Sequence, residues 1–197
     1  MLEIIAMISM FLDHIGLYIF DNNFVLRLIG RLALPIYGYL IIQGKDKTKD
    51  INKYIIRLLI IAIISQIPFY LLGNKALNVV FTYAAYVGIS KLRNKKLKSL
   101  SIILLMAVAA IIIDYGMYAV LYLLIIENSS RLLKLLGLNM LYTYIGWTYQ
   151  GFSLLAYIPI KIYEKYKIKL PERLRYIYRV FYPIHLLLIL FIKLFIN

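Results

Sequence analysis

The chain has 197 residues, of which 63% are hydrophobic and 16% are charged, and its formal net charge is +14 at pH 7. A soluble globular domain carries about 25% charged residues, so this composition excludes an ordinary soluble domain and indicates an integral membrane protein. The lack of cysteine excludes disulfides and a thiolate nucleophile, and two histidines are too few for a histidine-based zinc site, so we expect no bound metal.

Nine apolar runs approach the length of about 20 residues that a helix needs to cross a bilayer. They cover residues 4–20, 25–43, 54–73, 77–92, 99–115, 116–130, 132–149, 150–164 and 179–196. The sequence therefore predicts an all-α fold, a polytopic transmembrane helical bundle of about nine helices, or of eight if the run 132–149 is re-entrant. No linker, low-complexity tract or fixed-period repeat divides the chain, so we expect a single domain over residues 1–197.

The excess of positive charge gathers in the short gaps between the apolar runs. Clusters of lysine and arginine follow the second, fourth and sixth runs, and a longer basic stretch precedes the ninth. This pattern is typical of cytoplasmic loops, which are enriched in lysine and arginine. We therefore expect a cytoplasmic N-terminus, the lipid bilayer as the main partner, and no nucleic acid.

The first run carries an aspartate and a histidine side by side, Asp13 and His14. A charged side chain near the centre of a bilayer costs about 2.5–3.5 kcal/mol, so we take this pair as the candidate reaction centre. A helix that enters from the cytoplasm at Ile4 carries His14 roughly 15 Å into the bilayer. Because neighbouring residues on a helix project about 100° apart, Asp13 and His14 cannot easily bond to each other.

The second run supplies a partner for Asp13. Arg27 and Arg31 are spaced i, i+4 and therefore share one helix face. The returning helix brings both to the depth of Asp13. We expect Asp13 to pair with an arginine, which leaves His14 free for a substrate.

Three further polar residues are predicted to reach this depth from the fourth and fifth runs: Asn78, Thr82 and Asp114. If they stayed unpaired, the four charged groups of the first, second and fifth runs would together cost roughly 10–14 kcal/mol on the same insertion scale. These groups are Asp13, Arg27, Arg31 and Asp114. We therefore expect these groups to converge on one another or on water.

Six segments of the chain form an ordered set of motifs. They read IAMISMFLDHIG, LRLIGRLALPIYGYLIIQGKDKT, KYIIRLLIIAIISQIPF, NVVFT, DYGMYAVL and FYPIHLLL. Together they resemble the TraX family of membrane acetyltransferases, whose type member acetylates the N-terminus of the F-pilus subunit. By this resemblance His14 falls on the catalytic histidine, and the other polar motif positions are Asp13, Arg31, Asn78, Thr82, Asp114 and His185.

The resemblance implies an acetyl-CoA-dependent acyltransferase in the bacterial cytoplasmic (inner) membrane. It would move an acetyl group from cytosolic acetyl-CoA, the donor substrate, to an amine or hydroxyl acceptor, a peptide N-terminus or a glycan, on the outer side. We expect His14 to act as general base, with direct transfer and an acetyl-histidine intermediate both open. The alternative is a small transporter or channel-like protein with an intramembrane Asp-His-Arg cluster, because transporters also carry charges inside the membrane.

The candidate site residues form three groups. The catalytic residues are His14 and Asp13. Lysine and arginine at cytoplasmic helix ends suit the phosphates of acetyl-CoA, and the residues expected to bind this donor are Arg31, Lys53, Arg57, Arg179, Tyr182 and His185. The residues expected to bind the acceptor are Arg27, Asn78, Thr82 and Asp114. Pro183 is expected to break the last helix, with the His185 ring satisfying the freed carbonyl groups.

Overall fold

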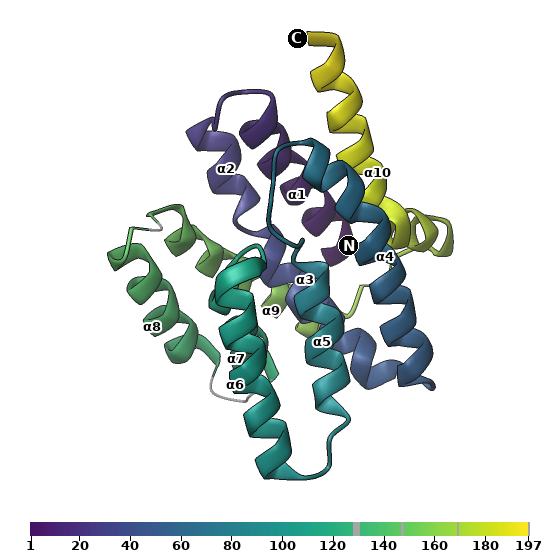
Figure 1. Cartoon of the computed structure of the whole chain (residues 1–197), viewed down its shortest axis with the longest axis vertical. Helices are drawn as coiled ribbons and strands as arrows, with labels where there is room; N and C mark the ends of the chain where they lie inside the picture. Colours follow the sequence, from purple (N-terminus) through teal and green to yellow (C-terminus); the bar gives the residue numbers. More distant parts are fainter. Residues whose placement is uncertain (128–130, 147, 169, 197) are drawn as a thin grey trace. The chain divides into compact units, whose positions relative to one another are not determined.

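The computed structural model describes residues 1–127, 131–146, 148–168 and 170–196 (Figure 1). Over these residues the chain forms ten α-helices, one 3-10 helix (η1) and no strand beyond an isolated bridge between Leu77 and Ile113. In chain order the elements are α1 (Leu2–Tyr18), α2 (Phe24–Gly30), α3 (Ala33–Lys47), α4 (Ile51–Leu71), α5 (Val80–Ser90), α6 (Lys95–Ile112), α7 (Gly116–Glu127), α8 (Arg131–Tyr144), η1 (Thr148–Ala156), α9 (Tyr157–Tyr166) and α10 (Glu172–Ile196). The predicted all-α fold class is confirmed.

Side-chain caps fix where three of these helices begin. The side chains of Asn23, Asp50 and Asn94 accept hydrogen bonds from backbone N–H groups in the first turns of α2, α4 and α6. Asparagine and aspartate are preferred at this position because they satisfy N–H groups that the helix itself leaves unpaired. Each cap therefore lies at the boundary between a loop and a helix that contains one of the apolar runs.

Three helical segments of the described chain are long and apolar enough to cross a membrane. They are Phe24–Lys47 (α2 with α3), Ile51–Leu71 (α4) and Leu174–Ile196 (within α10). The helices α4 and α10 also expose large apolar side chains, among them Ile67 at 65% and Phe191 at 58%. Apolar surface of this extent suits contact with lipid. The chain is therefore a membrane protein.

The predicted runs correspond to helices, and the largest differences are in the second, eighth and ninth runs. The second run is divided into α2 and α3, and Pro35 lies in the first turn of α3, where a missing backbone donor costs little. The eighth run begins as the 3-10 helix η1 and continues as α9.

The last helix, α10, begins at Glu172 and continues through Pro183, so the predicted break of this helix is wrong. A membrane helix tolerates proline when neighbouring groups satisfy the carbonyl groups that it leaves free. The ring of His185 bonds the carbonyl group of Phe181 at 2.8 Å, whereas the carbonyl that Pro183 leaves without its helical partner is that of Arg179.

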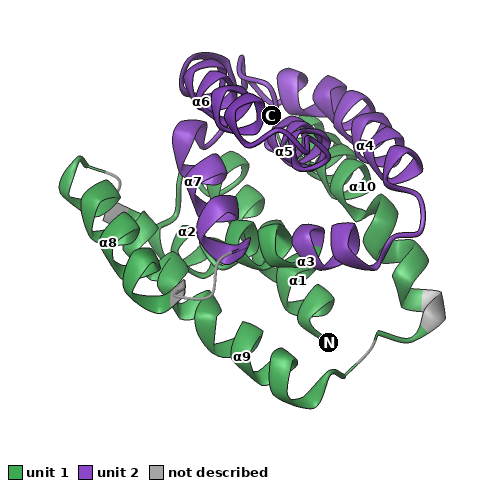
Figure 2. Ribbon diagram, turned by 90° about the horizontal axis from the view of Figure 1, so that it is seen from below, with its two compact units in different colours: residues 1–40, 130–197 green, residues 41–129 purple. Residues whose placement is uncertain are grey.

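The contacts divide the chain into two compact units (Figure 2). Unit 1 holds residues 1–40 and 130–197, and unit 2 holds residues 41–129. Unit 1 contains α1, α2, α8, η1, α9 and α10, unit 2 contains α4 to α7, and the division falls inside α3. The expectation of a single domain stays a prediction.

Two glycines allow α1 and α2 to pack closely in unit 1. A Cβ atom at Gly16 would lie 2.7 Å from the Cβ of Leu26, and one at Gly30 would lie 2.6 Å from the Cγ of Asp13. Carbon atoms that are not bonded to each other attract best at about 3.5–4.0 Å, so a methyl group at either position would force the helices apart. The glycines of the DHIG and GR segments therefore set the spacing at which side chains of α1 and α2 meet.

Candidate functional site

A buried carboxylate, Asp13, is held by two guanidinium groups in unit 1. Arg27 Nη1 lies 2.7 Å from Asp13 Oδ2, and Arg31 Nη2 lies 2.6 Å from Asp13 Oδ1. The Asp13 side chain is 4% exposed. Removing one partner of such a buried pair leaves an uncompensated charge, which is strongly destabilising. The predicted pairing of Asp13 with an arginine of the second run is confirmed, and both arginines take part.

A tight turn between α1 and α2 brings these groups to one level. Asp21 and Asn22 adopt left-handed backbone conformations, with φ of 43° and 64°, which aspartate and asparagine tolerate better than most residues. The backbone N–H of Asn23 donates to the carbonyl oxygen of Gly16 at 2.9 Å and closes the turn. The two arginines, four residues apart, then reach the same carboxylate on α1.

Both histidines of the chain meet inside unit 1. His14 Nδ1 on α1 lies 2.7 Å from His185 Nε2 on α10, and the two ring planes are 6° apart. His14 is 8% exposed and His185 is 1% exposed. The ring of Phe181 stacks on His185 with centroids 5.0 Å apart, and Tyr182 meets it edge-on at 5.5 Å. The structure therefore places His185, which was assigned to donor binding, directly against His14.

The hydrogen-bond partners assign the protons of this pair when both rings are neutral. The carbonyl oxygen of Phe181 can only accept, so His185 Nδ1, 2.8 Å away, donates to it. His185 Nε2 is then the acceptor and His14 Nδ1 the donor. This leaves the lone pair of His14 Nε2 available, which is the form that a general base requires.

Gln150, which the sequence does not single out, joins the carboxylate of Asp13 through Arg31. Its Oε1 lies 3.4 Å from Arg31 Nη1, and the residue is 1% exposed. In the sequence Gln150 is a single amide residue at the start of an apolar run. Nothing near it in the sequence indicates that it contacts Arg31, 119 residues away. We call Asp13, Arg27, Arg31 and Gln150 the clamp.

Asn78 in unit 2 has its polar side-chain atoms bonded within the protein. Its Nδ2 donates to the Ala62 carbonyl at 2.8 Å and to Gln66 Oε1 at 2.9 Å, and its Oδ1 accepts from the Val80 N–H at 3.1 Å. Gln66 also donates to the Ala76 carbonyl at 2.9 Å. This network joins α4 to the start of α5 and gives Asn78 a packing role. Its assignment to acceptor binding stays a prediction.

Thr82 and Asp114 also lie in unit 2. Thr82 is fully buried, and its Oγ1 has no hydrogen-bond partner within the described ranges. The backbone N–H of Asp114 donates to the Leu77 carbonyl at 2.8 Å, and its Oδ1 accepts from the Tyr115 N–H at 3.0 Å. Their expected roles beside His14 stay predictions.

Comparison with known proteins decides the family. A family model described as "TraX protein" matches residues 1–193. The chain belongs to the TraX family. A Dichelobacter nodosus protein named "Probable fimbrial assembly protein FimC, serogroup H1" is 28% identical over 234 residues, which cover 100% of this chain and 96% of that protein. "Uncharacterized protein RP591" of Rickettsia prowazekii (strain Madrid E) is 33% identical over 92 residues, 45% of this chain and 34% of that protein. No solved structure matches the chain.

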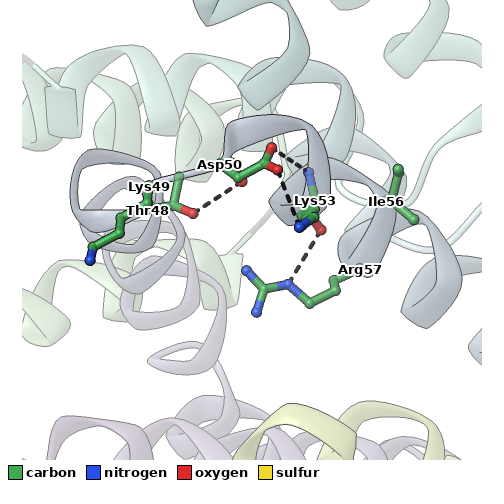
Figure 3. Close-up of a pocket in the computed structure, with 6 residues that line it drawn as sticks. All are labelled: Thr48, Lys49, Asp50, Lys53, Ile56 and Arg57. Carbon is green, nitrogen blue, oxygen red and sulfur yellow. Dashed lines mark hydrogen bonds and ion pairs between the residues drawn. The ribbon is translucent and has the colours of Figure 1, made fainter.

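The TraX-family chain carries a basic surface pocket at the start of α4 (Figure 3). Its volume is about 400 Å³, and its lining residues are Thr48, Lys49, Asp50, Lys53, Ile56 and Arg57. Asp50 faces Lys53, whose Nζ lies 3.8 Å from Asp50 Oδ2, and Arg57 Nε donates to the Lys53 carbonyl at 3.3 Å. The structure therefore brings together Lys53 and Arg57, two of the residues assigned to donor binding.

The other residues assigned to donor binding on α10 belong to unit 1. The guanidinium of Arg179 lies over the ring of Tyr176, 5.6 Å from its centroid. Tyr182, by contrast, is buried against His185. The assignment of Arg179 and Tyr182 to acetyl-CoA stays a prediction.

Proposed function

We propose that this TraX-family membrane protein is an acetyltransferase that moves the acetyl group of acetyl-CoA to an amine or hydroxyl acceptor. The observation that carries the proposal is the buried pair of imidazoles, His14 and His185, anchored by the Phe181 carbonyl. The name of the Dichelobacter nodosus relative points to fimbrial assembly. The N-terminal amine of a fimbrial subunit is therefore the first acceptor to test, and a glycan hydroxyl is the second.

The imidazole pair supplies the proton transfer that acetylation of an amine needs. The acceptor nitrogen attacks the thioester carbon while His14 Nε2 takes a proton from it, so that a C–N bond forms. The C–S bond then breaks, and the leaving thiolate of coenzyme A takes the proton from His14. His185 holds the His14 ring in one orientation and one tautomer, as a third group does for the base of a catalytic triad. A route through acetyl-histidine would use the same nitrogen.

The basic pocket at the start of α4 supports the choice of acetyl-CoA as donor. The coenzyme carries several negative charges on its phosphates, and lysine and arginine bind phosphate as a point charge and as a fork. Lys53 and Arg57 line this pocket together. We assign the pocket to the cytoplasmic side of the inner membrane, where acetyl-CoA is made, and the acceptor to the outer side.

The clamp favours an enzyme over a cation pathway. A carboxylate that conducts cations must offer its oxygens to the passing ion. Both oxygens of Asp13 are instead bound to guanidinium groups, at 2.6 and 2.7 Å. The carboxylate therefore suits a fixed electrostatic element beside His14 better than a transport site.

The test of the proposal is acetyl transfer by purified protein in lipid nanodiscs, with labelled acetyl-CoA and a fimbrial-subunit peptide. We expect His14→Ala to lower the rate about 100- to 10,000-fold, because general base catalysis contributes about that much. The matched control is Ile8→Ala, which removes an exposed side chain from the same helix and keeps the wild-type rate. A wild-type rate in His14→Ala, with equal insertion into membranes, would contradict the proposal.

A further inference from the structure

A buried amide group of the clamp has no acceptor in the described part of the chain. Arg31 only donates hydrogen bonds, so Gln150 turns its oxygen toward Arg31 and directs its Nε2 away from it. Gln150 Nε2 is buried and has no hydrogen-bond partner among the described residues. Burying a donor without an acceptor is costly, and a methionine of the same length would avoid that cost. The amide is therefore suited to an acceptor on a bound molecule.

The clamp also carries one positive charge more than it neutralises. Two guanidinium groups face one carboxylate. Arg27 Nε is a second buried donor for which the described residues provide no acceptor. Such a site suits an oxygen atom that gains one negative charge during a reaction. Asp13 of the clamp directly precedes His14 on α1, so the clamp and the proposed base lie at the same level of this helix.

We infer that Gln150 Nε2 donates a hydrogen bond to the carbonyl oxygen of the acetyl thioester and stabilises the oxyanion that forms there. This inference rests on the proposed function. When the acceptor nitrogen attacks, the electron pair of the C=O π bond moves onto the oxygen, and the hydrogen bond from Gln150 strengthens. When the C–S bond breaks, the pair returns to form the carbonyl group of the product. Arg31 fixes the orientation of the amide.

The first experiment measures steady-state acetyl transfer by Gln150→Met, which keeps the length of the side chain and removes the donor. We expect kcat to fall about 100- to 1,000-fold, as on loss of one oxyanion donor. We expect KM for acetyl-CoA to change less than about threefold, because the bond matters mainly in the transition state. The control is Phe152→Leu, a change of an exposed side chain on the same helix η1, which keeps both constants.

A second variant, Gln150→Glu, tests the same inference if Gln150→Met does not fold. Gln150→Glu keeps an oxygen for Arg31 but offers no amide donor, and we expect the same loss of kcat. If either variant has the Tm of the wild type and also keeps the wild-type kcat, the inference is overturned. An equal loss of kcat in Phe152→Leu would also overturn it, because the effect would then belong to the packing of η1.

A binding measurement separates this inference from the acetyltransferase proposal. Acetate serves as the probe because its oxygens accept hydrogen bonds and carry one negative charge. Replacing chloride by acetate at about 200 mM and constant ionic strength is expected to raise the Tm of the wild type by about 2–4 °C, and that of Gln150→Met by less than about 1 °C. Acetate binding without acetyl transfer would overturn the proposed function and support the oxygen site. Equal shifts in both proteins would overturn the site, whatever the activity.

Discussion

The two units each contain a buried polar network, and the networks differ in how completely their hydrogen bonds are formed. In unit 2 the side-chain oxygen and nitrogen of Asn78 are bonded to α4 and to the start of α5. In unit 1 the clamp has two donors without acceptors in the described chain, at Arg27 and Gln150, and the neighbouring His14 keeps a lone pair on Nε2. Asn78 and Gln150 are equally buried, at 0% and 1% exposure. Burial alone therefore does not distinguish the two networks; the donors left without acceptors in the clamp do.

The largest effect is expected from Asp13→Leu, which removes the central group of the unit 1 network. Two guanidinium groups would remain buried without their carboxylate, at a cost of about 3–5 kcal/mol. We expect Tm in detergent to fall by at least about 6 °C, measured by intrinsic fluorescence. Asp46→Leu, at a carboxylate whose side chain is 55% exposed, is the control and should leave Tm nearly unchanged. A wild-type Tm for Asp13→Leu would show that water, not protein, balances the arginines.

A smaller effect is expected from Asn78→Leu, which opens the closed network of unit 2. The substitution removes the side-chain bonds to the Ala62 carbonyl, to Gln66 Oε1 and to the Val80 N–H, and it costs about 1–3 kcal/mol of folding free energy. We expect acetyl transfer per folded molecule to stay at the wild-type level, because the role of Asn78 is packing. Wild-type Tm combined with a raised KM for the acceptor would reverse this interpretation and support the predicted acceptor role.

The smallest effect is expected from Gly30→Ala, which leaves every bonding group of the clamp in place and shifts its geometry. The added methyl group would overlap the side chain of Asp13, and relief of such overpacking costs about 1–2 kcal/mol. Acetyl transfer should fall together with Tm. Gly88→Ala on α5 is the matched control, because no atom beyond its own helix and chain neighbours lies within 4 Å of the added Cβ. If both variants behaved alike, the spacing of α1 and α2 would not depend on Gly30.

The features that sequence predicted well are those with local signals. Apolar runs of membrane length located the helices, because a helix in lipid must bond its own backbone groups and remain apolar outside. The spacing of Arg27 and Arg31 placed both on one face, and the cost of an unpaired charge then required a partner for Asp13. This pairing could be predicted because α1 and α2 form one helical hairpin and a short turn joins them.

The features that sequence could not predict depend on packing between distant segments. His14 and His185 are 171 residues apart, and Gln150 and Arg31 are 119 residues apart. No local pattern states which helices become neighbours. The prediction for Pro183 failed because a proline alone suggests a break, whereas α10 continues through it.

The bond between α1 and α10 has a consequence for how the protein is made. The first of these helices leaves the ribosome early, and the second leaves it only after the helices between them have been synthesised. The arginines that pair with Asp13 follow it within one hairpin, so its carboxylate gains a partner almost as soon as it is made. His14 gains its partner ring only when α10 arrives. A chain that stalls during translation therefore already has its buried aspartate paired, whereas its first histidine still lacks the ring that fixes its orientation.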